Sequence, residues 1–207
     1  MNKTLAIVLS MIVVVPALSG CVSLAEINSS FRRIDMAWDL DYQRTEDEFR
    51  ARVVDAPYPV VYEAMKKAFL DLGMPLAERS LKDGMLVARN AAPNPLTIDE
   101  WKEVRKVEEP RMKEIGGWYF VFKDDPKAYI VTVAAMMKAL GTEKTLIVIE
   151  YELDAPELRV HGVEPSKRAP PTAVRLASLK LWASLNNRLS EVKLPEARRR
   201  KPIELEV

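Results

Sequence analysis

The sequence predicts an α+β fold in which helices cover one face of an antiparallel β-sheet. Segments with strand composition follow one another through short turn sequences, which is typical of antiparallel strands. Two amphipathic helical segments interrupt this series, and the longest helical pattern comes last in the chain. Helices interspersed in this way bury their apolar sides against a single sheet, so we expect a two-layer sandwich of the helix-grip kind with a long C-terminal helix.

The composition limits the chemistry that the chain can perform. The 207 residues include one Cys, one His, and 31 Lys and Arg against 30 Asp and Glu. These counts exclude a disulfide framework and the usual Cys/His zinc site, and a near-neutral chain is a poor general binder of nucleic acid. We therefore expect no metal and no cofactor.

The N-terminus predicts an exported protein. Lys3 precedes an apolar run from Leu5 to Leu18, which is the order of a signal peptide. The run is shorter than the roughly 20 residues that span a bilayer. We expect residues 1–20 to be removed.

The residues at the expected cleavage point are Leu18-Ser19-Gly20-Cys21. This tetrapeptide resembles the lipobox of bacterial lipoproteins. The resemblance implies that Cys21 becomes the mature N-terminus and carries a diacylglyceryl group with fatty acids such as palmitate. Val22, not Asp, follows the cysteine, which implies the outer membrane and its periplasmic face.

Residues 21–48 are expected to connect the anchor to the domain. Within them, Ile34, Met36, Trp38, Leu40 and Tyr42 alternate with Asp35, Ala37, Asp39 and Asp41. This period of two predicts a half-buried strand over 34–42 with a solvated acidic face. A site for a hard cation and a segment that adds to a sheet edge are the alternatives. Trp38 and Tyr42 are candidate partner-binding residues.

A single domain is expected over residues 49–192. Its first half reads as a strand at Phe49–Asp55, a helix that starts after Pro57 and stops at Gly73, and a hairpin. The hairpin strands are Leu76–Leu81 and Met85–Ala91.

The second half of the domain begins with a capping box, Thr97-Ile98-Asp99-Glu100, which predicts a helix that ends by Pro110. The expected strands then are Trp118–Phe122, Ala128–Lys138 and Lys144–Leu153, with a further candidate at Leu158–Val163. Pro170-Pro171 opens the longest helix, which is expected to end near Glu191, and residues 193–207 form a basic tail.

Two segments resemble known families. Val54-Asp55-Ala56-Pro57-Tyr58-Pro59-Val60-Val61-Tyr62 is similar to the opening of START-like domains. The stretch Val60–Ala88, with its helix, Leu72-Gly73, strand, Asp83-Gly84 and second strand, resembles the repeated module of the NlpB/BamC lipoproteins. Both resemblances imply a helix-grip domain.

A catalytic site is not indicated. His161 is the one histidine, and no Gly-x-Ser-x-Gly motif accompanies it. We expect His161 to lie at the surface and the chain to be no enzyme.

An aromatic cluster is the remaining candidate site. Its members are Trp101, Trp118, Phe120 and Trp182, and Trp118 and Phe120 are expected to point the same way from one strand. The cluster is either core packing or the wall of an apolar groove under the last helix.

These observations predict a non-enzymatic lipoprotein of the outer membrane that binds another envelope protein as an accessory or scaffold subunit. The first alternative is a carrier of an apolar ligand, a lipid or envelope precursor, under the C-terminal helix. The second is an envelope hydrolase.

Overall fold

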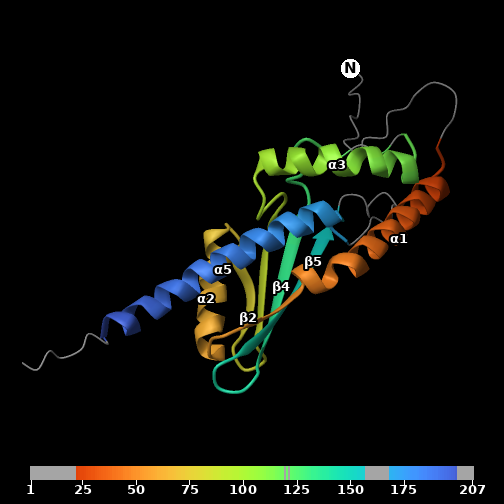
Figure 1. Cartoon of the computed structure of the whole chain (residues 1–207). Coiled ribbons are helices and arrows are strands. Elements are labelled where there is room, and N and C mark those ends of the chain that lie inside the picture. The colour runs from red at the N-terminus through yellow and green to blue at the C-terminus, as the bar shows by residue number, and fades with distance from the viewer. Residues whose placement is uncertain (1–21, 119, 121, 157–167, 200–207) are drawn as a thin grey trace, which may run out of the picture.

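The computed structural model describes residues 22–118, 120, 122–156 and 168–199 (Figure 1). Four helices and five strands lie in these ranges. In chain order they are α1 (Leu24–Phe49), β1 (Ala51–Val54), α2 (Tyr58–Asp71), β2 (Leu76–Ser80), β3 (Met85–Ala91), α3 (Ile98–Gly116), β4 (Ile130–Ala139), β5 (Thr145–Asp154) and α5 (Pro171–Arg199).

The strands form one antiparallel sheet in the order β1-β5-β4-β3-β2. Burial alternates along its central strands: Val133 and Ala135 of β4 are buried, as are Ile147 and Ile149 of β5, while their neighbours are more exposed. Among the described elements, the helices therefore cover one face of the sheet. The predicted α+β fold, with a long C-terminal helix against an antiparallel sheet, is confirmed.

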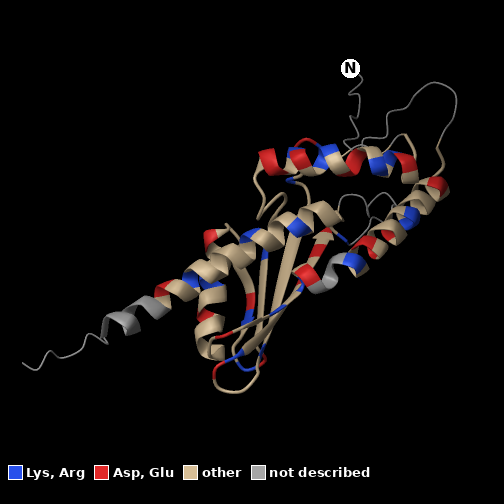
Figure 2. Ribbon diagram, in the orientation of Figure 1, with Lys and Arg blue, Asp and Glu red and all other residues tan. Residues whose placement is uncertain are grey.

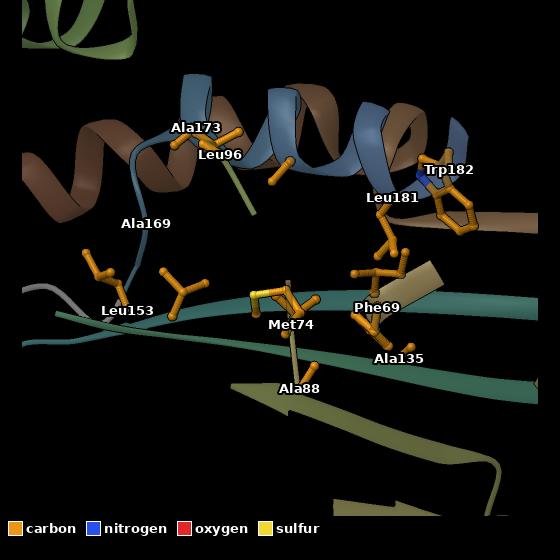
Figure 3. Packing of buried hydrophobic residues seen from close by; sticks show 14 of the residues in the cluster. Phe69, Met74, Ala88, Leu96, Ala135, Leu153, Ala169, Ala173, Leu181 and Trp182 are labelled. Atoms are coloured by element: carbon orange, nitrogen blue, oxygen red, sulfur yellow. The ribbon is translucent and has the colours of Figure 1, made fainter. Parts of the chain in front are cut away.

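The core lies between this face and helices α2 and α5. Figure 3 shows Phe69 of α2 and Leu181 of α5 meeting above Ala135 of β4. Burial of each large side chain of this kind contributes about 1.5–3 kcal/mol. Figure 2 shows that the part of α5 above the sheet is mainly uncharged, whereas charged residues follow much of α3.

The segment 34–42 is a helix, so the predicted strand is wrong. It belongs to α1, in which Phe31, Ile34 and Trp38 are buried in the common core, whereas Met36 and Leu40 are exposed. Positions 34, 38 and 42 satisfy a period of two and also lie on one side of a helix. The packing of α1 on α3 and α5 stabilises the helical conformation of this segment.

Two further expectations about the middle of the chain are wrong. The helix that opens at the confirmed capping box runs through Pro110 to Gly116. Proline inside a helix removes one backbone hydrogen bond, but the last turns bury Met112 and place Gly116 against Ile34 and Phe120, which stabilises them. The described residues of 118–122 are not in a strand.

The C-terminal helix is longer than predicted, because α5 continues from Pro171 to Arg199. Residues 193–199 of the predicted basic tail, which include Arg198 and Arg199, therefore belong to the helix. Residues 200–207 and the candidate strand 158–163 lie outside the described residues.

Two ion pairs join α5 to the neighbouring helices and make the fold sensitive to acid. Arg188 Nε donates to Asp71 Oδ2 at 2.7 Å, and this hydrogen bond lowers the pKa of Asp71. Burial alone would raise the pKa of Glu100, but hydrogen bonds from Lys180 Nζ at 2.7 Å and from Thr97 hold it below its ordinary value.

We expect the free energy of unfolding to fall as the pH drops below about 4. A carboxyl group with a lowered folded-state pKa stabilises the fold above its unfolded-state value and loses that contribution as the pH falls through the folded-state value. The ordinary value of Asp71 is 3.8. Since the pair is partly exposed, its contribution is less than about 1 kcal/mol.

Urea denaturation at several pH values tests this expectation with Asp71→Asn. The variant should show a flatter decline in stability below pH 4 than the wild type. Asp55→Asn is the matched control, because Asp55 lies 3.7 Å from Lys144 and is largely exposed. Parallel pH curves for Asp71→Asn and the wild type would contradict the assignment.

Candidate functional site

A cleft opens where the second half of β5 meets the end of α1 and the start of α5. Its volume is about 590 Å³. Three aromatic rings line it, from Tyr42, Phe49 and Tyr151, together with charged side chains of both signs. The charged residues are Asp39, Arg50, Glu150, Glu152, Arg168 and Arg175.

One wall of the cleft is an edge of β5 along which no described strand pairs. The short strand β1 pairs only with Thr145–Val148 of β5, and the last bond on this side runs from Ile149 N to Arg50 O at 2.8 Å. Backbone groups two residues apart point to the same side of a strand. The N–H and C=O groups of Tyr151 and Leu153 therefore face the same edge, and no described strand pairs with them there.

Two tyrosines form the inner side of the cleft. The Tyr42 hydroxyl of α1 donates to Ala169 O at 2.6 Å, and the Tyr151 hydroxyl lies beside the Ser178 hydroxyl of α5. Burial raises the pKa of both phenols well above the ordinary value of 10. Both therefore remain neutral and able to donate hydrogen bonds across the physiological pH range.

The charges on the rim are mostly paired within the protein. Arg168 forms an ion pair with Asp39 and its guanidinium lies 5.4 Å from the centre of the Tyr42 ring. Arg50 forms a second ion pair on the rim, with Glu150. Among the described residues, Glu152 and Arg175 have no such ion pair; the Arg175 guanidinium lies 5.6 Å from the centre of the Phe49 ring, and Glu152 presents an exposed carboxylate.

The start of α5 is fixed by a buried carboxylate from α3. Glu108 is only 2% exposed, and its Oε1 accepts hydrogen bonds from Thr172 N at 3.0 Å and Thr172 Oγ1 at 2.6 Å. An anion at a helix N-terminus satisfies free backbone donors and interacts favourably with the helix dipole. A second link, from Arg111 of α3 to Asp41 of α1, connects α1 to the same helix, so the two links together join α1, α3 and α5. These side-chain contacts hold together the helices that surround the cleft.

The structure does not gather the predicted aromatic residues into one groove. Trp38, Trp101, Phe120 and Trp182 are buried in the core. Trp101 Nε1 donates to Lys123 O at 2.9 Å. Trp118 is 61% exposed and does not point into the core with Phe120, contrary to expectation, because this segment is not a strand. Of the six candidates, Tyr42 alone lines the cleft.

Sequence reasoning missed Tyr151 and Arg168, although one signal was available. The strand predicted at Lys144–Leu153 is longer than the one at Phe49–Asp55. Once the two strands are known to pair, this difference leaves part of the longer strand without a neighbour on one side.

Some predicted features lie outside the described residues, namely Cys21 and His161. Within the described ranges, no cluster of three or more His, Cys, Asp or Glu side chains is arranged to hold a metal ion. No helix there is long and apolar enough to cross a membrane. No protein-family model matches the chain, and no curated protein is significantly similar to it.

Proposed function

We propose that the chain is a lipoprotein of the outer membrane, on the periplasmic side, that serves as a non-enzymatic binding subunit for another envelope protein. The apolar N-terminal run and the lipobox-like Leu18-Ser19-Gly20-Cys21 support the anchor. The cleft beside β5 supports the binding role.

The edge of β5 at Tyr151, which no strand of the described ranges covers, carries the proposal. It presents the backbone donor and acceptor of Tyr151 in a cleft of about 590 Å³, and no described strand pairs with them there. An extended peptide that adds to such an edge gains affinity from main-chain hydrogen bonds and specificity from its alternate side chains. We infer that the partner supplies an extended segment that continues the sheet beyond β1.

The side chains of β5 indicate the chemistry of that segment. Tyr151 faces the helices, so an inward residue of the partner meets aromatic surface, whereas Glu150 and Glu152 face the open side of the sheet. Glu150 is paired with Arg50, which leaves Glu152 for the partner. Opposite charges on adjacent strands stabilise their pairing, so a Lys or Arg beside Glu152 fits best.

The same features favour a peptide over an apolar ligand. Buried side chains such as Leu181, Trp182 and Phe69 occupy the space between α5 and the sheet (Figure 3). The cleft itself is lined by six charged residues, and sites for apolar ligands are lined mainly by hydrophobic side chains.

Site-specific crosslinking in intact host cells tests the binding role. A photoreactive benzoylphenylalanine placed at Gln43, an exposed residue that lines the cleft, is expected to capture a discrete protein partner. Glu152→Lys should reduce the yield of that product by at least about fivefold, because it replaces attraction with repulsion at the contact. Mass spectrometry of the crosslinked peptides identifies the partner segment.

Glu143→Lys is the matched control. Glu143 is an exposed glutamate in the turn between β4 and β5, away from the cleft, so the yield should remain unchanged. Equal yields from Glu152→Lys and the wild type would contradict binding along this edge, and so would a crosslinked peptide of the partner that is helical in the complex.

A further inference from the structure

Trp118 is an exposed aromatic residue that belongs neither to the buried core cluster nor to the lining of the cleft. It lies in the turn directly after α3 and is 61% exposed, whereas Trp38, Trp101 and Trp182 are each at most 4% exposed. Exposed tryptophan is enriched where proteins meet the boundary between lipid and water, because its ring is apolar and its N–H is polar.

The turn that carries Trp118 is held against the first half of α1. The rings of Phe31 and Phe120 lie 5.3 Å apart in an edge-to-face contact, and Arg33 Nε donates to Ile115 O at 3.0 Å. A Cβ atom added at Gly116 would lie within 3 Å of side-chain atoms of Ile34 and Phe120, which shows how closely the elements approach. The end of α3 and the start of α1 lie on the same side of the molecule (Figure 1).

The start of α1 is also close to the proposed anchor. The helix begins at Leu24, three positions after Cys21. Three residues of extended chain span at most about 10 Å. A lipid on Cys21 therefore keeps this end of α1 at the membrane surface, and Leu24 itself presents a half-exposed apolar side chain there.

We propose that the side chains of Trp118 and Leu24 enter the interfacial region of the phospholipid bilayer and form a second, non-covalent contact beside the lipid anchor. This inference rests on the proposed lipidation of Cys21. The contact would fix the orientation of the domain on the membrane, because one point of attachment permits rotation and tilting whereas two separate points restrict both.

Fluorescence quenching by brominated lipid tests the proposal. The mature lipidated protein is reconstituted into vesicles of phosphatidylethanolamine and phosphatidylglycerol whose acyl chains carry bromine near the head group. Bromine quenches only nearby indoles, so we expect a loss of emission from the wild type. Trp118→Phe should retain less than about one third of that loss, because the other three tryptophans are buried.

Trp101→Phe is the matched control and should be quenched as strongly as the wild type, because Trp101 lies in the core. Equal quenching of Trp118→Phe and the wild type overturns the proposal. Absence of quenching in vesicle-bound wild type also overturns it, and would point to a protein surface as the partner of Trp118.

Flotation of the vesicles and mass spectrometry of the N-terminal peptide separate the two proposals. If Cys21 carries no lipid and the protein does not float with the vesicles, the anchor itself fails. If the lipidated protein floats but Trp118 is not quenched, only the second contact fails.

Discussion

Gly84→Ala is expected to destabilise the protein by more than about 3 kcal/mol. Gly84 has a φ of +70°, and a Cβ atom there would lie 2.0 Å from the carbonyl oxygen of Met137. The two strands meet at this point through a hydrogen bond from Met137 N to Gly84 O of 2.7 Å. A methyl group must push β3 away from β4, because the obstructing atom belongs to the backbone.

Gly141→Ala is the matched control for this experiment. Gly141 also has a positive φ, of +86°, but a Cβ atom added there meets nothing within 4 Å. Its replacement should cost only about 1–2 kcal/mol for the left-handed conformation. Urea denaturation measures both variants, and equal losses of stability would show that the contact between Gly84 and Met137 is not the cause.

Trp182→Ala is expected to lower the free energy of unfolding by about 3–5 kcal/mol. Trp182 belongs to α5 and is 2% exposed, and its Nε1 donates to Phe49 O at 3.0 Å. The Arg52 guanidinium lies 4.8 Å from the centre of its ring. Truncation leaves a cavity and an unpaired carbonyl at the junction of α1 and β1.

Two further variants separate the causes of this loss. Trp182→Phe retains an aromatic ring but not the hydrogen bond, so it should cost less than Trp182→Ala. Leu179→Ala is the control on the same helix, because Leu179 is 43% exposed, and should change stability by less than about 1 kcal/mol. A similar effect of Leu179→Ala and Trp182→Ala would contradict the role assigned to the buried indole.

The sequence was sufficient to predict the elements whose stop and start residues are unambiguous. The hairpin of β2 and β3 turns at Gly84, α2 stops before Gly73, and the capping box at Thr97 opens α3. In each case the local chemistry and the tertiary packing favour the same conformation, so short-range rules were adequate.

Two elements were mispredicted because distant contacts outweighed the local preference. The spacing of Ile34, Trp38 and Tyr42 fits a strand and a helix equally well, and the decision depends on α3 and α5, which follow much later in the chain. Pro110 ordinarily marks a boundary, but Met112 and the fit of Gly116 extend the helix beyond it.

The candidate site was the least predictable part of the molecule. Tyr42 was predicted as a partner-binding candidate on a strand, whereas it lies on helix α1 and lines the cleft. The cleft itself depends on β1 covering only Thr145–Val148, and on Glu108 reaching from α3 to the start of α5. Neither relation has a sequence pattern, since each joins residues that are 64 or more positions apart.

If Cys21 carries the proposed lipid, the length of helix α1 limits how far from the bilayer the cleft can lie. Tyr42 at the cleft lies about 27 Å along the helix axis from Leu24, at 1.5 Å per residue. Because Phe31, Ile34 and Trp38 pack into the common core, α1 is part of the domain and not a flexible linker. Its length therefore sets the separation between Leu24 and the cleft. Under that proposal, a partner segment has to lie within this distance of the bilayer to reach the cleft, so the length of α1 would contribute to the choice of partner.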